Sequence, residues 1–193
     1  LGATAYRNIP GEDKDGVVGA VEFIEGLRMN HANTKVGDKV VVLGGGNTAM
    51  DAASESARMG AKSVTLAYRS SKERMGAYGF EYDLALTAGV KGMFHASPIE
   101  IMGNGSVTGI KLTNEEGNEI VVECDMVIKA TGQAKQGNFY SLIEGLNIDK
   151  STKIEVNPNS NQTSNPKYFA GGDAINGGAE VVNAAYDGKL AAN

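Results

Sequence analysis

The sequence predicts an α/β fold with a parallel sheet, and three observations carry that prediction. An apolar run at Lys39–Leu43 leads into a glycine-rich turn, and a helix is expected from Asn47. A second apolar run at Ser63–Tyr68 completes a βαβ unit of about thirty residues. Further along, short strands separated by turn sequences predict a β-meander. Together these features indicate a Rossmann-like three-layer domain.

The elements before and within the βαβ unit follow from spacing and turn residues. Leu1–Gly11 is expected to be a connecting segment. Val17–Arg28 is predicted to be a helix, because its apolar residues recur at helical spacing. Small residues on one face of the helix from Asn47 would let it pack closely on the sheet, and Gly60 is expected to end it.

The elements after the βαβ unit alternate between helix and strand before the meander begins. We expect a helix at Glu81–Thr87 and a short strand at Val90–His95. The meander strands are predicted at Ser97–Met102, Ser106–Thr113 and Glu119–Glu123. Met126–Ala130 is predicted to return to the parallel sheet, with Thr131-Gly132 at its carboxyl end, where open α/β sheets bind ligands.

The tail is a different kind of sequence. It contains a polar loop at Asn157–Pro166, an expected short strand at Tyr168–Ala170 and an expected helix at Ala179–Ala192. Between the last two, Gly171-Gly172-Asp173 forms a second glycine turn. This turn suggests a second cofactor site, and a tight turn with a helix-capping acid remains the alternative.

The first glycine turn predicts a dinucleotide phosphate site. In the turn Gly44, Gly45 and Gly46, the outer two glycines take the first two positions of G-x-G-x-x-G/A, and Ala49 takes the third. These positions need a tight turn and close approach of the backbone to a pyrophosphate. The following helix would direct its free N–H groups and positive dipole end at the phosphates.

The end of the second strand favours NADPH over NADH. Enzymes for NAD usually place an acidic residue there, whereas this chain has Tyr68 and Arg69, with Lys72 and Arg74 close behind. A guanidinium suits a phosphate monoester, and each such contact contributes roughly 1.5–3 kcal/mol, about ten- to a hundredfold in affinity. A solvated charged loop is the alternative for both arginines.

Composition limits the function classes. The chain has 193 residues, of which 41% are hydrophobic and 21% charged, enough for one domain or slightly more. A net charge of −5 argues against nucleic-acid binding, and the strand-sized apolar runs argue against a membrane span. Cys124 is the single cysteine and is expected to pack as an apolar residue; with only His31 and His95, no metal site is expected. We expect a cytoplasmic location.

Several segments resemble the two-dinucleotide flavoproteins that include the small subunit of glutamate synthase and the flavin half of dihydropyrimidine dehydrogenase. The resemblance covers nearly the whole chain. It rests on R-N-I-P-G-E-D (Arg7–Asp13), V-L-G-G-G-N-T-A-M-D (Val42–Asp51), A-Y-R-S-S-K-E-R-M (Ala67–Met75), K-A-T-G-Q (Lys129–Gln133), F-A-G-G-D (Phe169–Asp173) and the run from Val181 to Lys189.

This resemblance implies two sets of cofactor contacts. It implies NADPH contacts at Asn47, Thr48, Arg69, Arg74, Ala130, Thr131 and Gly132, and FAD contacts at Gly172, Asp173, Glu180 and Val181. The chain departs from the family pattern at Ser70, where a second arginine is usual, and at Gly76, where proline is usual. These departures leave the strength of the NADPH preference open.

The resemblance also implies a domain arrangement. Residues 1–30 would be a linker and helix from an FAD domain, 31–135 an NAD(P)-binding domain, and 136–193 the C-terminal part of a truncated FAD domain. Family members carry an N-terminal FAD-binding βαβ unit, and usually an iron–sulfur segment before it, that this sequence lacks. We therefore expect the chain to bind pyridine nucleotide but to hold FAD poorly, and to be inactive by itself.

The implied reaction is hydride transfer from NADPH to FAD, with electrons passed to iron–sulfur centres and a partner subunit or domain. The cofactors carry that reaction, so we assign no catalytic side chain. One alternative is a nucleotide-binding module without electron transfer. Another is a dehydrogenase acting on a small substrate, which needs a proton donor; His95, the sole histidine after the glycine motif, has no obvious partner.

Overall fold

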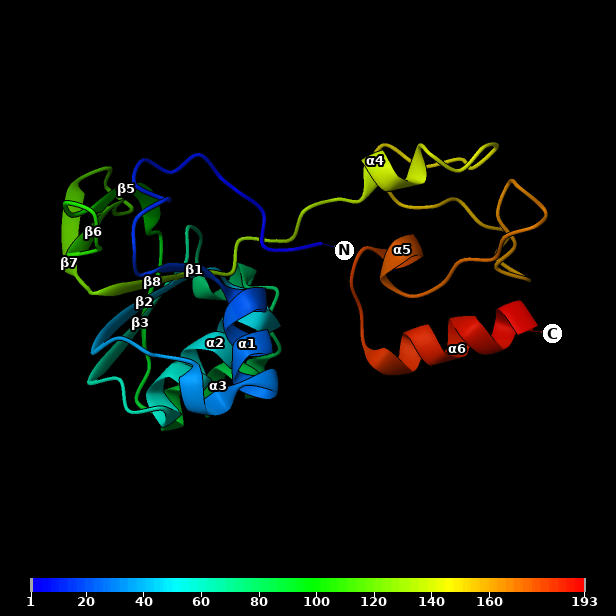
Figure 1. The fold of residues 1–193 in the computed structure, drawn as a ribbon. Coiled ribbons are helices and arrows are strands. Elements are labelled where there is room, and N and C mark those ends of the chain that lie inside the picture. Colours follow the sequence, from blue (N-terminus) through cyan, green and yellow to red (C-terminus); the bar gives the residue numbers. More distant parts are fainter. Residues whose placement is uncertain (1, 193) are drawn as a thin grey trace. The chain divides into compact units, whose positions relative to one another are not determined.

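A computed structural model describes residues 2–192 in two compact units. Residues 3–132 form the first unit, and Gly2 with residues 133–192 forms the second (Figure 1). The first unit contains a five-stranded parallel sheet with strand order β1-β8-β2-β3-β4 and an antiparallel sheet with order β5-β6-β7. The α/β class with a parallel sheet and a meander is therefore confirmed.

The elements of the first unit alternate along the chain. The parallel strands are β1 (Val17–Gly19), β2 (Lys39–Leu43), β3 (Ser63–Ala67), β4 (Lys91–Met93) and β8 (Met126–Lys129). The meander consists of β5 (Ser97–Met102), β6 (Gly109–Thr113) and β7 (Glu119–Glu123). The helices are α1 (Ala20–Met29), α2 (Asn47–Arg58) and α3 (Gly79–Thr87), with 3-10 turns at His31–Asn33 and Lys72–Arg74.

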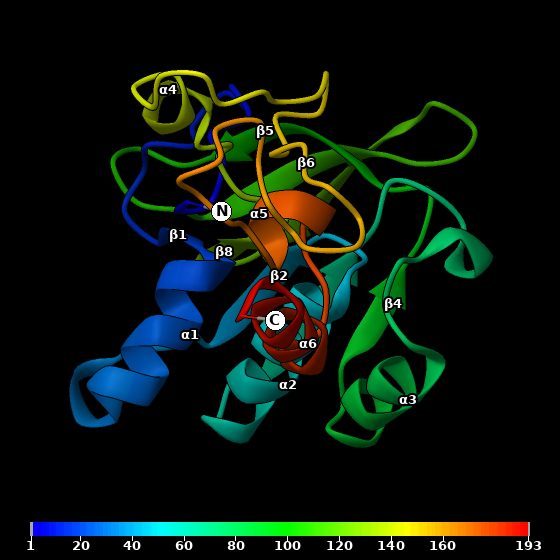
Figure 2. The ribbon, with the colours of Figure 1, turned by 90° about the vertical axis from the view of Figure 1, so that its right-hand side faces the viewer.

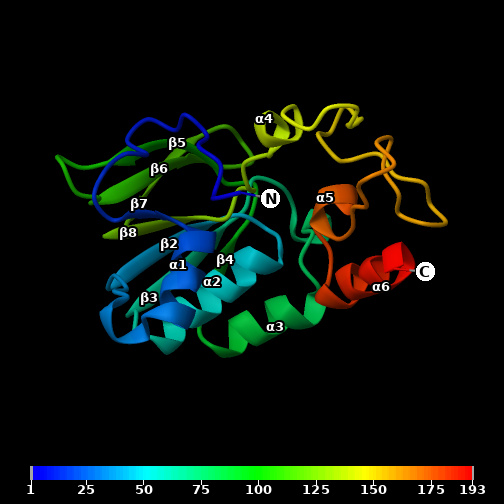
Figure 3. The same ribbon diagram turned by 45° about the vertical axis from the view of Figure 1, so that its right-hand side comes forward.

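The first unit has three layers. Helices α1, α2 and α3 cover one face of the parallel sheet and follow one another along it (Figure 2), while the meander covers the other face (Figure 3). Side chains of β2 alternate between the two faces: Val40 and Val42 pack against the helices, and Val41 and Leu43 pack against the meander. A strand that is apolar on both faces is thus buried by two separate cores.

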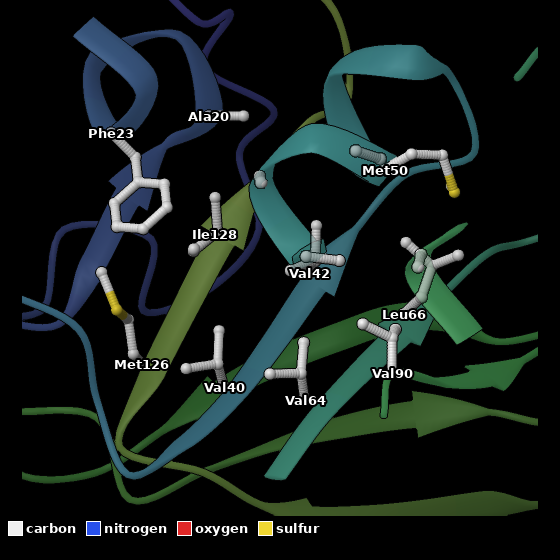
Figure 4. Packing of buried hydrophobic residues seen from close by; sticks show 14 of the residues in the cluster. Ala20, Phe23, Val40, Val42, Met50, Val64, Leu66, Val90, Met126 and Ile128 are labelled. Carbon is white, nitrogen blue, oxygen red and sulfur yellow. The ribbon is translucent and has the colours of Figure 1, made fainter. Parts of the chain in front are cut away.

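The helix-side core explains why α2 lies close to the sheet. Figure 4 shows Phe23 from α1 and Met50 from α2 above Val42 and Ile128 of the sheet. Ala49, Ala52 and Ala53 of α2 are completely buried in the same core. Small side chains on this face let the helix approach β2, which fixes where its N-terminus lies.

Two predicted elements before residue 110 need correction. The helix predicted over Val17–Arg28 is wrong at its start, because residues 17–19 pair in parallel with residues 127–129 of β8 and the helix begins only at Ala20. β-Branched Val17 and Val18 suit an edge strand, and the pairing partner lies far along the chain. Strand β6 begins at Gly109, since Ser106 bridges to Asp15 instead of pairing in the meander.

The second unit contains short helices joined by hydrogen-bonded loops. Its helices are α4 (Gly137–Tyr140), α5 (Asp173–Asn176) and α6 (Val181–Ala192). The strand predicted at Tyr168–Ala170 is wrong: Phe169 makes a single antiparallel bridge to Gln162, and no ladder extends it within the described part of this unit. Helix α4 was not predicted. No helix within residues 2–192 is both long and apolar enough to cross a membrane.

Candidate functional site

The carboxyl ends of three parallel strands lie side by side in the first unit. Leu43, the last residue of β2, pairs with Ala67 at the end of β3 and with Lys129 at the end of β8. The residues that follow these ends line a cavity of about 520 Å³. It is lined by Arg7, Ile9, Leu43, Gly44, Gly45, Gly46, Ala67, Tyr68, Arg69, Gly76, Ala96, Pro98, Ala130 and Thr131.

The glycine turn closes tightly at its first residue and stays open at its third. Gly44 has φ 149°, and a Cβ there would lie 2.5 Å from the carbonyl oxygen of Ala130, so a side chain is excluded. At Gly46 no atom lies within 4 Å of the place a Cβ would take. The sheet therefore explains Gly44, whereas the space left by Gly46 opens toward solvent beside the cavity wall.

The N-terminus of α2 begins at this turn with unpaired donors. The N–H groups of Ala49 and Met50 donate to the carbonyl of Gly46 at 2.9 and 3.2 Å, and those of Asn47 and Thr48 donate to no residue within 2–192. No side chain caps the helix at Gly46. Free N–H groups and the helix dipole make this end suited to an anion.

Asn47 also holds a neighbouring loop in place. Its Oδ1 accepts a hydrogen bond from the backbone N–H of Tyr78 at 2.9 Å, and the carbonyl of Gly45 accepts one from Ala77 at 3.0 Å. These bonds fix the loop before α3 against the glycine turn. Thr48 is exposed.

The two arginines after β3 lie in different places. Arg69 lines the cavity, and its side chain makes no ion pair with a residue in the described range. Arg74 does not line the cavity; its carbonyl accepts a hydrogen bond from the Tyr68 hydroxyl at 2.8 Å. Lys72 lies with its Nζ 4.8 Å from the centre of the Tyr82 ring. The structure thus brings Arg69, and not Arg74, to the cavity wall.

The turn after β8 lies beside a residue that was not predicted for the site. Ala130 and Thr131 line the cavity, and Gly132 follows with φ 110°. The guanidinium of Arg7 donates through Nε to Thr131 Oγ1 at 3.3 Å and through a terminal nitrogen to the Thr131 carbonyl. In the sequence, the only indication of a role for Arg7 is its place at the start of the R-N-I-P-G-E-D segment.

A buried ion pair fixes the Arg7 segment on β8. Lys129 Nζ donates to the carboxylate of Glu12, and both side chains are almost fully buried. The N–H groups of Arg7 and Ile9 donate to the same carboxylate at 3.0 and 3.1 Å. Burial opposes ionisation of Glu12, but the hydrogen bonds from Lys129 and the two N–H groups outweigh it and hold the pKa of the carboxyl below its ordinary value.

The residues predicted for a second cofactor lie in the second unit. Gly172 is buried, and its N–H donates to Asp187 Oδ2 at 2.7 Å. Asp173 Oδ1 accepts a hydrogen bond from the N–H of Ala179 at 3.3 Å, and Glu180 follows Ala179 directly before α6. Asp173, Glu180 and Val181 are exposed. The four residues are thus tied to α6 or to the loop before it, and their flavin role stays a prediction.

The remaining titratable groups considered from the sequence do not meet in this cavity. Cys124 packs in the meander-side core, as expected, and burial together with the neighbouring Asp125 raises the pKa of its thiol to about 12. His95 lies outside the cavity lining, with Nε2 3.8 Å from Glu115. Within residues 2–192 no three His, Cys, Asp or Glu side chains are grouped to hold a metal ion.

Comparisons with known proteins identify the family of this chain. The family model described as pyridine nucleotide-disulphide oxidoreductase matches residues 1–188. The glutamate synthase [NADPH] small chain of Escherichia coli K12 is 36% identical over 100% of this chain and 48% of its own length. The NADP(+)-dependent formate dehydrogenase subunit beta of Moorella thermoacetica is 32% identical over 100% of this chain and 30% of its own.

A solved structure gives the same fold. A crystal structure of T. acidophilum thioredoxin reductase matches with a TM-score of 0.82 and 25% identity, covering 100% of this chain and 62% of that one. The chain therefore spans about half or less of the curated relatives named above, and somewhat more of the solved structure. The resemblance to the glutamate synthase small subunit, stated from the motifs, is confirmed.

Proposed function

Since this chain belongs to the pyridine nucleotide-disulphide oxidoreductase family, we propose that its first unit binds NADPH at the glycine turn and presents it to FAD. The parent activity would be hydride transfer from NADPH to FAD. Electrons would then pass to iron–sulfur centres in a partner subunit or domain. The names of two relatives, an NADPH glutamate synthase small chain and an NADP(+)-dependent formate dehydrogenase subunit, support the choice of NADPH as the nucleotide.

One observation carries the nucleotide part of the proposal. The glycine turn, which leads directly into the free N–H groups of α2, and Arg69, which makes no ion pair within residues 2–192, line the same cavity. The first suits a pyrophosphate, and the second suits the 2′-phosphate that distinguishes NADPH from NADH. Asn47, Thr48, Ala130 and Gly132 would complete the contacts around the nucleotide. Arg74 would contribute less, because it lies outside the cavity lining.

The side chains at this site would bind and orient the nucleotide. Bound flavin would supply the hydride acceptor, while the chain holds the nicotinamide in position and limits access of water. In this proposal the first unit, residues 3–132, binds the pyridine nucleotide, since β1 and α1 pack within it. Residues 136–193 would belong to the flavin side. There Gly172, Asp173, Glu180 and Val181 would contact FAD. A cytoplasmic location fits this chemistry.

Calorimetric titration of the purified chain with NADPH and NADH tests the proposal. Arg69→Ala should weaken NADPH binding about tenfold and leave NADH binding unchanged, since only one charge-assisted contact is lost. Arg58→Ala is the matched control, because Arg58 lies near the far end of α2 and pairs with Glu55. Equal loss for both nucleotides, or no binding of either, would contradict the assignment of the site.

A flavin measurement separates electron transfer from simple nucleotide binding. We expect the chain to hold FAD poorly, so absorbance near the flavin bands should show little bound cofactor after purification. Full-length protein that reduces added flavin with NADPH would support the oxidoreductase role. Full-length protein that binds NADPH but never reduces flavin would favour a nucleotide-binding module.

A further inference from the structure

The side chain of Arg7 is a cation held in place by neutral groups alone. Its guanidinium donates to the hydroxyl and to the carbonyl of Thr131. Within residues 2–192 it makes no ion pair, because the nearby carboxylate of Glu12 is bonded to Lys129 and to two backbone N–H groups. An arginine on a cavity wall without a carboxylate partner is suited to an anion from outside the protein.

The guanidinium of Arg7 lies close to the backbone of Gly132. A Cβ at Gly132 would come within 2.8 Å of a terminal nitrogen of Arg7, so a side chain there would displace it. The Glu12–Lys129 pair ties the segment carrying Arg7 to β8. The segment that carries Arg7 is therefore attached to β8 through Glu12, and its guanidinium is bonded to the turn that follows β8.

The order of strands separates the two cavity arginines. Arg7 lies on the β8 side through Thr131, and Arg69 follows β3, while the glycine turn follows β2 between those two strands. A dinucleotide whose pyrophosphate rests on the glycine turn extends one half toward each side. If the 2′-phosphate of the adenosine half meets Arg69, the other half extends toward Arg7.

We propose that Arg7 binds the nicotinamide mononucleotide half of the cofactor, by donating to the phosphate on that side of the pyrophosphate. This inference rests on the proposed function, since it assumes a pyridine dinucleotide at the glycine turn. It adds a second arginine with a different task. Arg69 selects between NADPH and NADH, whereas Arg7 holds a part that both nucleotides share.

Two ligands test the proposal, because each lacks the group that one of the two arginines would contact. NADH lacks the 2′-phosphate, and 2′,5′-ADP lacks the nicotinamide mononucleotide half. Arg7→Ala should weaken NADH binding about tenfold and leave 2′,5′-ADP binding unchanged. Arg69→Ala should weaken 2′,5′-ADP binding about tenfold and leave NADH binding unchanged. Calorimetry on the whole chain measures both, with Arg58→Ala as the control that changes neither.

Thr131→Val gives a second variant that keeps the positive charge. It removes the hydroxyl that accepts from Nε, so NADH binding should weaken less than in Arg7→Ala and 2′,5′-ADP binding should stay the same. Equal weakening of both ligands by Arg7→Ala, or unchanged NADH binding, would overturn the inference. Absence of binding of either ligand to the unaltered chain would instead reject the proposed function itself.

Discussion

The two units of this chain are stabilised in different ways. The first unit buries two apolar clusters, one on each face of its parallel sheet. Within residues 133–192 no apolar side chain is buried; the buried residues there include Asn161 and Thr163, and Leu142 and Val181 are each 81% exposed. The glycine turn therefore follows a strand that is buried between two apolar cores. The predicted flavin residues lie instead on short helices and loops of a unit in which residues 133–192 bury no apolar side chain.

The difference indicates which unit can fold independently. Apolar burial is the dominant favourable contribution to folding, and a segment without it gains little to offset the loss of chain entropy. Exposed apolar side chains on α6, at Val181, Val182 and Tyr186, are typical of a surface that another part of a protein covers. We expect the second unit to need such a cover to be stable.

The largest expected effect comes from separating the units. Residues 3–132 expressed alone should unfold cooperatively on heating, and residues 133–193 alone should show no cooperative transition. Circular dichroism and calorimetry measure this directly. A cooperative transition in the shorter piece would break the comparison, because it would reveal a stable fold without a buried apolar core.

The next effect concerns the buried ion pair of the first unit. Lys129→Met leaves the Glu12 carboxylate buried without its partner and should lower the free energy of unfolding by about 3–5 kcal/mol. Lys167→Met, at an exposed lysine of the second unit, should change it by less than about 0.5 kcal/mol. Chemical denaturation gives both values, and similar losses in the two variants would argue against the contrast.

A matched pair of apolar truncations sharpens the comparison further. Leu66→Ala removes a completely buried side chain and should cost about 2–5 kcal/mol. Val182→Ala removes a side chain that is 68% exposed, and it should change the free energy of unfolding by less than about 0.5 kcal/mol. A large loss at Val182 would mean that α6 is already covered in solution, for example by a second copy.

The smallest expected effect is a pH dependence of the first unit. The pKa of Glu12 is lowered in the folded protein, so its ionised form adds stability above its ordinary value of 4.5. That contribution is lost as pH falls through the lower folded-state value. The double variant Glu12→Gln/Lys129→Met lacks this contribution. The difference in free energy of unfolding between the unaltered chain and the double variant should therefore shrink as the pH is lowered, as chemical denaturation at several pH values would measure. A difference that does not change with pH would exclude this role.

Local sequence was sufficient for the central part of the fold. The strand, glycine turn, helix and second strand from Lys39 to Ala67 follow from patterns read within a few residues of each other, and the structure confirms them. The error at Val17 has the opposite cause: its strand depends on pairing with β8, more than a hundred residues later. The error at Phe169 is different, because its partner Gln162 is close in sequence, and there one bridge forms without a ladder.

The candidate site was predicted in part for the same reason. Gly44 and Arg69 belong to one contiguous βαβ unit, and the parallel pairing of β2 with β3 brings both to the cavity. Arg7, Ala96 and Pro98 reach it from distant segments, and only the folded chain shows that they do. Glu12 and Lys129 are 117 residues apart, and no periodic pattern links them.

The buried thiol of Cys124 gives this protein a built-in reporter of opening. It is the single cysteine of the sequence, it lies in the meander-side core at 3% exposure, and its raised pKa leaves almost no thiolate at neutral pH. A thiol reagent can therefore modify the native chain only while local or global unfolding separates the meander from the sheet. The rate at which Cys124 is modified, with and without nucleotide, would measure how often this part of the molecule opens, and no added cysteine is needed.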